Sequence, residues 1–213
     1  MKLFIDFDDV LFFSKKFIQD EKNIFLKHGI SEELFKKHYY HFRENDKNKK
    51  YRFYDLDKQL EGIRNELGMD ISPLEKEAKK FIEDTSRYVF PDVESFLKEI
   101  KKDDLFILSY SKTEFQRLKI ENCRLARYFR KIIITDRKKS EAIMLAMKEN
   151  DIKKGEDIYF IDDRADYISE VKKSLPQVKT ILVRRKEGRY HDLESEDSDY
   201  EVENFSQVFP IIK

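Results

Sequence analysis

Three aspartates follow the first apolar run of the chain, in the sequence MKLFIDFDDVLFF. The run at residues 3–5 is apolar enough for a buried strand, yet Asp6, Asp8 and Asp9 come directly after it. Carboxylates gathered at the end of a buried strand repel one another unless a positive charge holds them. Taken alone, Asp6 and Asp8 are also compatible with a helix N-cap or with surface acids. The rest of the chain must therefore supply the partners of a chemical site.

Other residues that can do chemistry also stand where apolar runs end. Ser109 ends the run LFIL, and Asp162 and Asp163 end the run IYFI. Lys138 and Lys139 lie at the start of a helix predicted after KIIIT. Ligands of open α/β sheets bind beyond the carboxyl ends of the strands, so we expect these side chains to meet the first acids in one crevice. Carboxylates, a hydroxyl and an ammonium group suit the transfer of a phosphoryl group.

The helices and strands that must position these residues follow two patterns. Residues 14–86 show apolar side chains at helical spacing and almost no strand signal, and GIS before EELF predicts a helix end followed by a helix capped by Ser31. From Pro91 onward, short apolar strands alternate with helices, which predicts a parallel sheet covered on both faces. We therefore expect an α/β fold: a doubly wound, Rossmann-like parallel sheet of residues 1–13 and 87–213, with residues 14–86 inserted as a helical cap domain.

The second pattern predicts particular elements. Its strands are DDLFILS, RKIIIT, DIYFID and VKTILVRR, and its helices are PDVESFLKEIKK, EFQRLKIENC, SEAIMLAMKEN and YISEVKKSL. The polar stretch HDLESEDSDYEVENF predicts a solvated connection that leads to a last edge strand.

Composition excludes some classes of protein. The 213 residues hold 43 basic and 43 acidic side chains, so no overall charge draws the chain to nucleic acid or to a membrane surface. The single Cys123 cannot form an internal disulfide, and no apolar stretch approaches the ~20 residues needed to span a bilayer. The N-terminus has no signal-peptide pattern, so we expect a cytoplasmic protein with no membrane partner. The balanced charge disfavours a nucleic-acid partner. The sequence leaves the oligomeric state open.

Four motifs, in order and each at its expected structural position, resemble those of the haloacid dehalogenase-like superfamily of phosphatases. The resemblance covers nearly the whole chain. An apolar strand followed by Asp-x-Asp is present as LFIDFDDVL, and a strand ending in Ser or Thr as LFILSYS. A Lys ahead of a helix is present as RKKSEAIML, and a strand ending in acids as YFIDDRAD. The sequence VFPDVESFLKEI also resembles the segment by which such chains re-enter the core after a cap.

This resemblance implies catalytic roles. Asp6 would be the nucleophile, forming an aspartyl-phosphate that water hydrolyses. Asp8 would protonate the leaving oxygen and later activate the water; it projects to the same side as Asp6 if the chain stays extended. Ser109 would donate a hydrogen bond to a phosphoryl oxygen, with Ser111 as its rival. Lys139, ranked above Lys138 by its spacing to SEAIML, would neutralise the charge that builds on the transferred group.

The resemblance also implies a magnesium ion and leaves one of its ligands open. The ion would be held by a carboxylate oxygen of Asp6, the backbone carbonyl of Asp8 and the later acids. We favour Asp162 as the first of these acids, with Asp163 and Asp166 as second ligand or orienting partner. At the positions after the Asp-x-Asp motif, this chain has Asp9 where Gly is common and Val10 where Thr is common. Neither position supplies a reacting group, so both departures look tolerable.

A basic, aromatic-rich segment inside the expected cap is a candidate for substrate binding. Seven Lys or Arg lie between Lys36 and Arg52, against Glu44 and Asp46. Such a segment suits contact with the remainder of a phosphorylated substrate or with single-stranded nucleic acid, and its alternative is a set of solvated charges. The residues expected to contact substrate are Lys47, Lys49, Lys50 and Arg52.

The function that we expect is a magnesium-dependent phosphomonoester hydrolase that acts on a small phosphorylated metabolite or nucleotide. A phosphomutase or phosphotransferase of the same fold is an alternative, in which a substrate hydroxyl replaces water. A nucleic-acid-binding or end-processing protein that uses the basic segment is another. Hydrolysis of a carbon–halogen bond is disfavoured, because that chemistry uses neither the second Asp of the first motif nor the metal.

Overall fold

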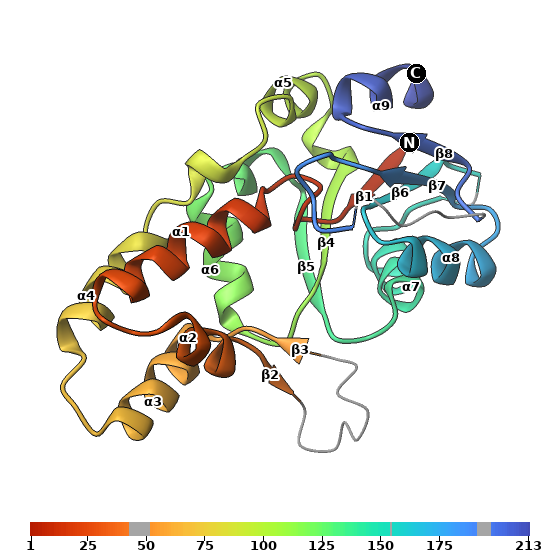
Figure 1. The fold of residues 1–213 in the computed structure, drawn as a ribbon. Helices are drawn as coiled ribbons and strands as arrows, with labels where there is room; N and C mark the ends of the chain where they lie inside the picture. The colour runs from red at the N-terminus through yellow and green to blue at the C-terminus, as the bar shows by residue number, and fades with distance from the viewer. Residues whose placement is uncertain (43–51, 154, 191–196) are drawn as a thin grey trace.

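A six-stranded sheet in the order β5-β4-β1-β6-β7-β8 forms the centre of the molecule (Figure 1). The computed structural model describes residues 1–42, 52–153, 155–190 and 197–213. All neighbouring strands of this sheet run parallel, which confirms the predicted doubly wound parallel sheet. The sequence predicts the last edge strand after the polar stretch, but β8 lies inside this stretch, and the residues that follow it belong to a helix, α9 (Phe205–Ile212). The strands are β1 (Lys2–Ile5), β4 (Leu105–Tyr110), β5 (Lys131–Thr135), β6 (Ile158–Asp162), β7 (Lys179–Val183) and β8 (Tyr200–Val202).

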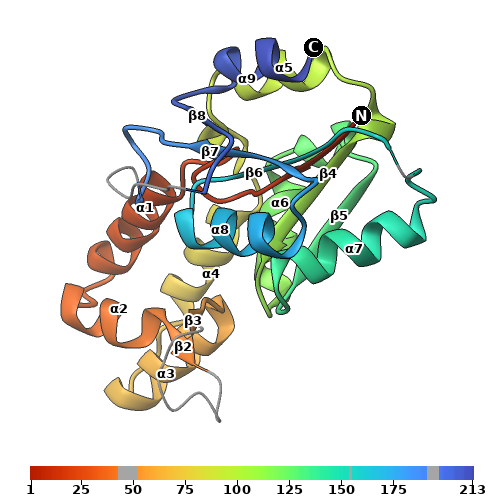
Figure 2. The same cartoon turned by 90° about the vertical axis from the view of Figure 1, so that its right-hand side faces the viewer.

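Helices cover both faces of the sheet (Figure 2). On one face, α7 (Lys139–Glu149) and α8 (Ala165–Ser174) pack against side chains such as Phe4 and Phe160. On the other face, α5 (Val93–Lys98), α6 (Glu114–Asn122) and α9 (Phe205–Ile212) share a core with Leu3, Ile5 and Ile161. Successive side chains of a strand point to opposite faces, so strands buried on both sides must be apolar throughout. Single turns of 3-10 helix lie at Ser86–Tyr88, Lys102–Asp104 and Leu125–Tyr128.

The segment between β1 and β4 is mainly helical and lies to one side of the sheet (Figure 1). It contains α1 (Ser14–Lys27), α2 (Glu32–Tyr39), α3 (Leu56–Leu67) and α4 (Ser72–Ile82). The expectation of almost no strands here is wrong in one place, because β2 (His41–Phe42) and β3 (Arg52–Phe53) pair antiparallel. A strand of two residues is too short for an alternating pattern to be recognised in the sequence. None of the described helices is long and apolar enough to span a membrane.

The predicted boundary between α1 and α2 is confirmed. Gly29 has φ of 80°, a left-handed conformation that favours glycine, and it lies just after the end of α1. Ser31 is the N-cap of α2, and its side chain accepts a hydrogen bond of 3.2 Å from the backbone N–H of Leu34.

The chain leaves the sheet and returns to it along adjacent paths. The backbone N–H of Phe13 donates to the carbonyl of Tyr88 at 2.7 Å, and that of Phe90 donates to the carbonyl of Leu11 at 3.1 Å. Buried side chains of α1–α4 nevertheless belong to the same apolar cluster as one face of the sheet. The division into a core of residues 1–13 and 87–213 and a cap of residues 14–86 therefore stays a prediction.

This shared cluster predicts a large stability effect inside the helical segment. Phe25 of α1 is fully buried and packs edge-on against Phe35 of α2, with ring centroids 5.0 Å apart. Phe25→Ala should lower the free energy of unfolding by about 3–5 kcal/mol, because it leaves a cavity in the core. Urea unfolding followed by circular dichroism measures it. The adjacent Leu26 is 40% exposed, so Leu26→Ala is a matched control with an expected change within about 0.5 kcal/mol. Equal effects of the two variants would contradict the packing of α1 against α2.

Candidate active site

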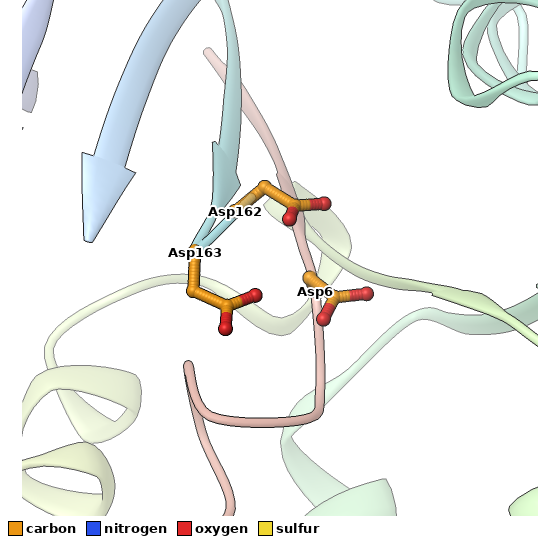
Figure 3. Close-up of side chains that lie close together, drawn as sticks. All are labelled: Asp6, Asp162 and Asp163. Carbon is orange, nitrogen blue, oxygen red and sulfur yellow. The ribbon is translucent and has the colours of Figure 1, made fainter. Parts of the chain in front are cut away.

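Three buried carboxylates meet where β1 and β6 end (Figure 3). Ile5 and Ile161 are paired in the parallel ladder, and the backbone N–H of the next residue, Asp6, donates to the carbonyl of Ile161 at 2.8 Å. Asp6, Asp162 and Asp163 are 7%, 0% and 6% exposed, and one carboxylate oxygen of each lies within 4.8 Å of the others. The strand order therefore brings together acids that are more than 150 positions apart in the sequence.

A buried lysine lies against this cluster. Lys139 is the first residue of α7 and is 1% exposed. Its Nζ donates to Asp6 Oδ1 at 2.6 Å and to the carbonyl of Leu108 at 2.5 Å, and it lies 3.3 Å from Asp162 Oδ2. The preceding Lys138 is exposed at the N-cap position of the helix. Of the two lysines suggested by the sequence, the structure brings Lys139 to the acids.

Asp8 is held by a different set of groups. Its Oδ1 accepts a hydrogen bond of 2.6 Å from Lys119 Nζ and another from the Ser14 hydroxyl, and its Oδ2 accepts one of 2.8 Å from Gln116 Nε2. Burial alone would raise the pKa of Asp8, but Lys119 and Arg189 outweigh it and hold this pKa well below its usual range. Asp8 is therefore ionised while its carboxylate keeps these partners.

Asp6 and Asp8 face helices on opposite sides of the sheet. Asp6 pairs with Lys139 of α7, whereas Asp8 pairs with Lys119 of α6. The expectation that the two carboxylates project to the same side assumed an extended chain, but β1 ends at Ile5 and the following residues form a turn. Both side chains nevertheless line the same cavity.

Ser109 lies in β4 beside these groups. It is 1% exposed, and its Oγ accepts a hydrogen bond of 2.8 Å from Gln116 Nε2, the same amide group that donates to Asp8. Ser111 follows β4, and its Oγ accepts a bond of 3.3 Å from the backbone N–H of Thr113. Both serines line the cavity, so the choice between them stays open.

The departure at Asp9 has a structural explanation. Asp9 is fully buried with φ of 58°, in the region where glycine is favoured and where aspartate is one of the better tolerated alternatives. Its Oδ1 accepts a bond of 3.1 Å from the backbone N–H of Ser14, and its Oδ2 accepts one from Arg189 Nε. The turn after the first strand is thus fixed by a side chain 180 positions away. Val10, which stands where Thr is common in the family, is fully buried.

Sequence reasoning missed three residues of the site: Gln116, Lys119 and Arg189. On α6, polar Gln116 and Lys119 occupy the buried face together with Phe115 and Ile120. A lysine and a glutamine on an otherwise apolar helix face are a detectable signal of buried polar partners. Arg189 has no such signal, because its partner lies at the other end of the chain.

A cavity of about 160 Å³ opens above these groups. Of the catalytic candidates, its wall holds Asp6, Asp8 and Ser109 but not the buried Lys139. From the helical segment, the aromatic side chains of Tyr39, Tyr40, Phe53 and Tyr54 line it. Of the basic residues expected to bind substrate, Lys47, Lys49 and Lys50 lie outside the described residues. Of Arg52 the structure describes only the backbone, in β3, next to Phe53.

The haloacid dehalogenase-like hydrolase family matches residues 3–181 of the sequence. The chain belongs to this family. A search of curated proteins gave no match.

Solved structures of such hydrolases share the fold of this family member. A haloacid dehalogenase-like hydrolase from Burkholderia xenovorans has a TM-score of 0.75 at 18% identity, over 97% of this chain and 95% of that one. The HAD-hydrolase YfnB from Bacillus subtilis, bound to magnesium, has a TM-score of 0.66 at 13% identity, over 100% and 98%. An L-2-haloacid dehalogenase has a TM-score of 0.64 at 13% identity, over 99% and 97%.

The acid cluster of this HAD-like hydrolase fits a divalent metal ion, which hydrolases of the family typically use. Burial raises the pKa of Asp6, opposed by Lys139; burial likewise raises the pKa of Asp162 to about 7 and that of Asp163 well above its usual value. One oxygen each of Asp162 and Asp163 is buried without a hydrogen-bond partner. These raised pKa values express the cost of ionising all three acids side by side, because three carboxylates against one ammonium group would leave an excess of two negative charges. A divalent cation would balance them.

Asp166 lies outside the cluster. It is exposed in the first turn of α8, and both of its carboxylate oxygens accept bonds from the Arg164 guanidinium, at 2.9 and 2.6 Å. The sequence left Asp163 and Asp166 open as the second late acid of the metal site, and the structure brings only Asp163 to Asp6 and Asp162.

This geometry predicts different effects of two conservative changes on magnesium binding. Asp163→Asn removes a charged oxygen from the cluster and should weaken binding of Mg²⁺ at least about tenfold. Asp166→Asn is the matched control and should leave the affinity within about twofold. Isothermal titration of the metal-free proteins with MgCl₂ measures both. A comparable loss in Asp166→Asn, or none in Asp163→Asn, would contradict the assignment.

Proposed function

We propose that this HAD-like hydrolase is a magnesium-dependent phosphomonoester hydrolase that acts through an aspartyl-phosphate on a small phosphorylated metabolite or nucleotide. The observation that carries the proposal is the acid cluster around Asp6, in which Asp162 and Asp163 each keep a buried oxygen without a hydrogen-bond partner. Hydrolysis of a carbon–halogen bond needs neither a metal ion nor Asp8. Similar structures include both a dehalogenase and a magnesium-bound hydrolase, so the fold alone does not choose between the two reactions.

In the first step, a carboxylate oxygen of Asp6 attacks phosphorus, a new O–P bond forms and the bond from phosphorus to the leaving oxygen breaks. Lys139, 2.6 Å from Asp6, supplies positive charge next to the transferred group. Ser109 donates a hydrogen bond from its hydroxyl to a phosphoryl oxygen. Mg²⁺ held by Asp6, Asp162, Asp163 and the backbone carbonyl of Asp8 would neutralise charge on the phosphoryl oxygens.

Asp8 moves the protons of both steps. It is ionised at rest, and the arrival of an anionic phosphoryl group raises its pKa, because a nearby negative charge favours the neutral acid. Asp8 takes up a proton from solvent as the substrate binds and then gives this proton to the leaving oxygen. In the second step the Asp8 carboxylate takes a proton from water, which attacks phosphorus and releases phosphate from Asp6.

Residues 14–86 act as a cap over this site. Tyr39, Phe53 and Tyr54 line the cavity, which places aromatic surface where the part of the substrate that is not transferred must lie. The cap excludes water and contacts that remainder. Its basic residues Lys47, Lys49, Lys50 and Arg52 contact an anionic leaving group.

The experiment that tests this function is a screen of phosphorylated metabolites and nucleotides with MgCl₂, in which released phosphate is measured. A parallel assay with a 2-chloroalkanoic acid measures released chloride. We expect phosphate release that stops in excess chelator and returns with magnesium. Chloride release that persists in chelator, without phosphate release, would identify a dehalogenase instead.

The nucleophile assignment gives a separate prediction. Asp6→Asn keeps the shape of the side chain but cannot attack phosphorus, so turnover should fall more than about a thousandfold, or about 4 kcal/mol. Released phosphate measures turnover, and thermal unfolding checks the fold. The control is Asp103→Asn, in an exposed turn before β4 at the opposite end of the strand from Ser109. An Asp6→Asn enzyme with near-normal turnover would remove Asp6 from this role.

A further inference from the structure

Lys119 is a buried cation that none of the family motifs includes. It lies one turn after Gln116 on the inner face of α6 and is 8% exposed. Its Nζ is 2.6 Å from Asp8 Oδ1. The same Nζ lies 5.4, 5.3 and 5.9 Å from the ring centroids of Phe7, Phe12 and Phe17.

Stability alone does not explain a lysine at this position. Removing an ammonium group from water is costly, and a buried ion pair often stabilises a protein no better than apolar side chains of similar volume. The three phenylalanine rings around Lys119 would accept an apolar side chain of the same length. The charge of Lys119 therefore needs a role in the site.

The position of Lys119 indicates the leaving-group side of the reaction. In a phosphoryl transfer the attacking and leaving oxygens lie roughly in line on opposite sides of phosphorus. Asp6 is on the attacking side with Lys139. Lys119 lines the cavity and bonds Asp8, the group that serves the leaving oxygen in the proposed function.

We propose that Lys119 is a positioning residue that holds Asp8 beside the leaving oxygen and adds positive charge there. The inference rests on the proposed phosphatase function. When the bond from phosphorus breaks, its electron pair stays on the leaving oxygen, which takes the proton of Asp8. Lys119 keeps its own proton and stabilises the negative charge while it builds, as Lys139 does on the side of the nucleophile.

The dependence of rate on the leaving group tests this role. Lys119→Met should lower kcat/KM about a hundredfold for an alkyl phosphate, whose leaving oxygen needs a proton and positive charge. It should lower kcat/KM less than about threefold for dinitrophenyl phosphate, whose leaving group is a weak base and departs without protonation. Lys119→Arg keeps the charge and should restore most of the activity on the alkyl phosphate. Arg117→Met removes a cation from the exposed face of the same helix and is the matched control.

A double-mutant cycle tests whether Lys119 acts through Asp8. In an Asp8→Asn background, which already lacks the proton donor, Lys119→Met should cost less than about tenfold on the alkyl phosphate, because only the direct effect of its positive charge remains to be lost. Thermal unfolding of each variant checks the fold. If the losses of kcat/KM in the two single variants simply multiply in the double variant, Lys119 does not act through Asp8, and its role as a positioning residue fails.

The remaining outcomes separate this inference from the proposed function. If wild-type enzyme hydrolyses both phosphates and Lys119→Met slows both equally, the role of Lys119 fails and the proposed function stands. If wild-type enzyme with magnesium hydrolyses neither of these phosphates nor any other in the screen, the proposed function fails, and the role of Lys119 fails with it.

Discussion

The repulsion among acids at one edge of the sheet is the constraint on which the rest of the site depends. Because β1 and β6 are neighbours, the acids that follow them are forced within a few ångströms of one another. Asp6, Asp8 and Asp9 each have a cation of their own, namely Lys139, Lys119 and Arg189. Among the described residues, Asp162 and Asp163 have no cation of their own, and each keeps a buried oxygen without a hydrogen-bond partner, where a metal ion would bind.

These cations reach the acids only when the sheet has formed. They lie 133, 111 and 180 positions from their partners, and all three follow the helical segment in the chain. Lys119 lies on the inner face of α6, Lys139 at the start of α7 and Arg189 in the connection after β7. All three elements follow strands of the sheet, which explains why the cations meet the acids at the same edge.

The fold and the acids of the site could be predicted from local sequence patterns, whereas two of the cations, Lys119 and Arg189, depend on long-range packing and were missed. Asp6, Asp162 and Asp163 stand directly after apolar strands, so local pattern and parallel topology suffice to place them. Lys119 and Arg189 depend on which helix face or loop meets the turn after β1, and that is a long-range property. The sequence could not choose between Asp163 and Asp166 for a similar reason, because the spacing of either acid fits the motif. Only the structure shows that the Arg164 guanidinium binds the carboxylate of Asp166.

The two acids of the first motif differ because they belong to different layers of the molecule. Asp6 faces α7, which packs on one side of the sheet, and Asp8 faces α6, which packs on the other. Burial dominates at Asp6 and raises its pKa, whereas two cations dominate at Asp8 and lower its pKa. Carboxylates two positions apart therefore hold different protonation states in the protein without metal or substrate. The proposed reaction needs the opposite order, with Asp6 ionised by a cation at the acid cluster and Asp8 protonated when the phosphoryl group arrives. Because β1 ends at Ile5, Asp6 and Asp8 are not bound to the alternation of an extended strand, and the chain can present them to opposite layers.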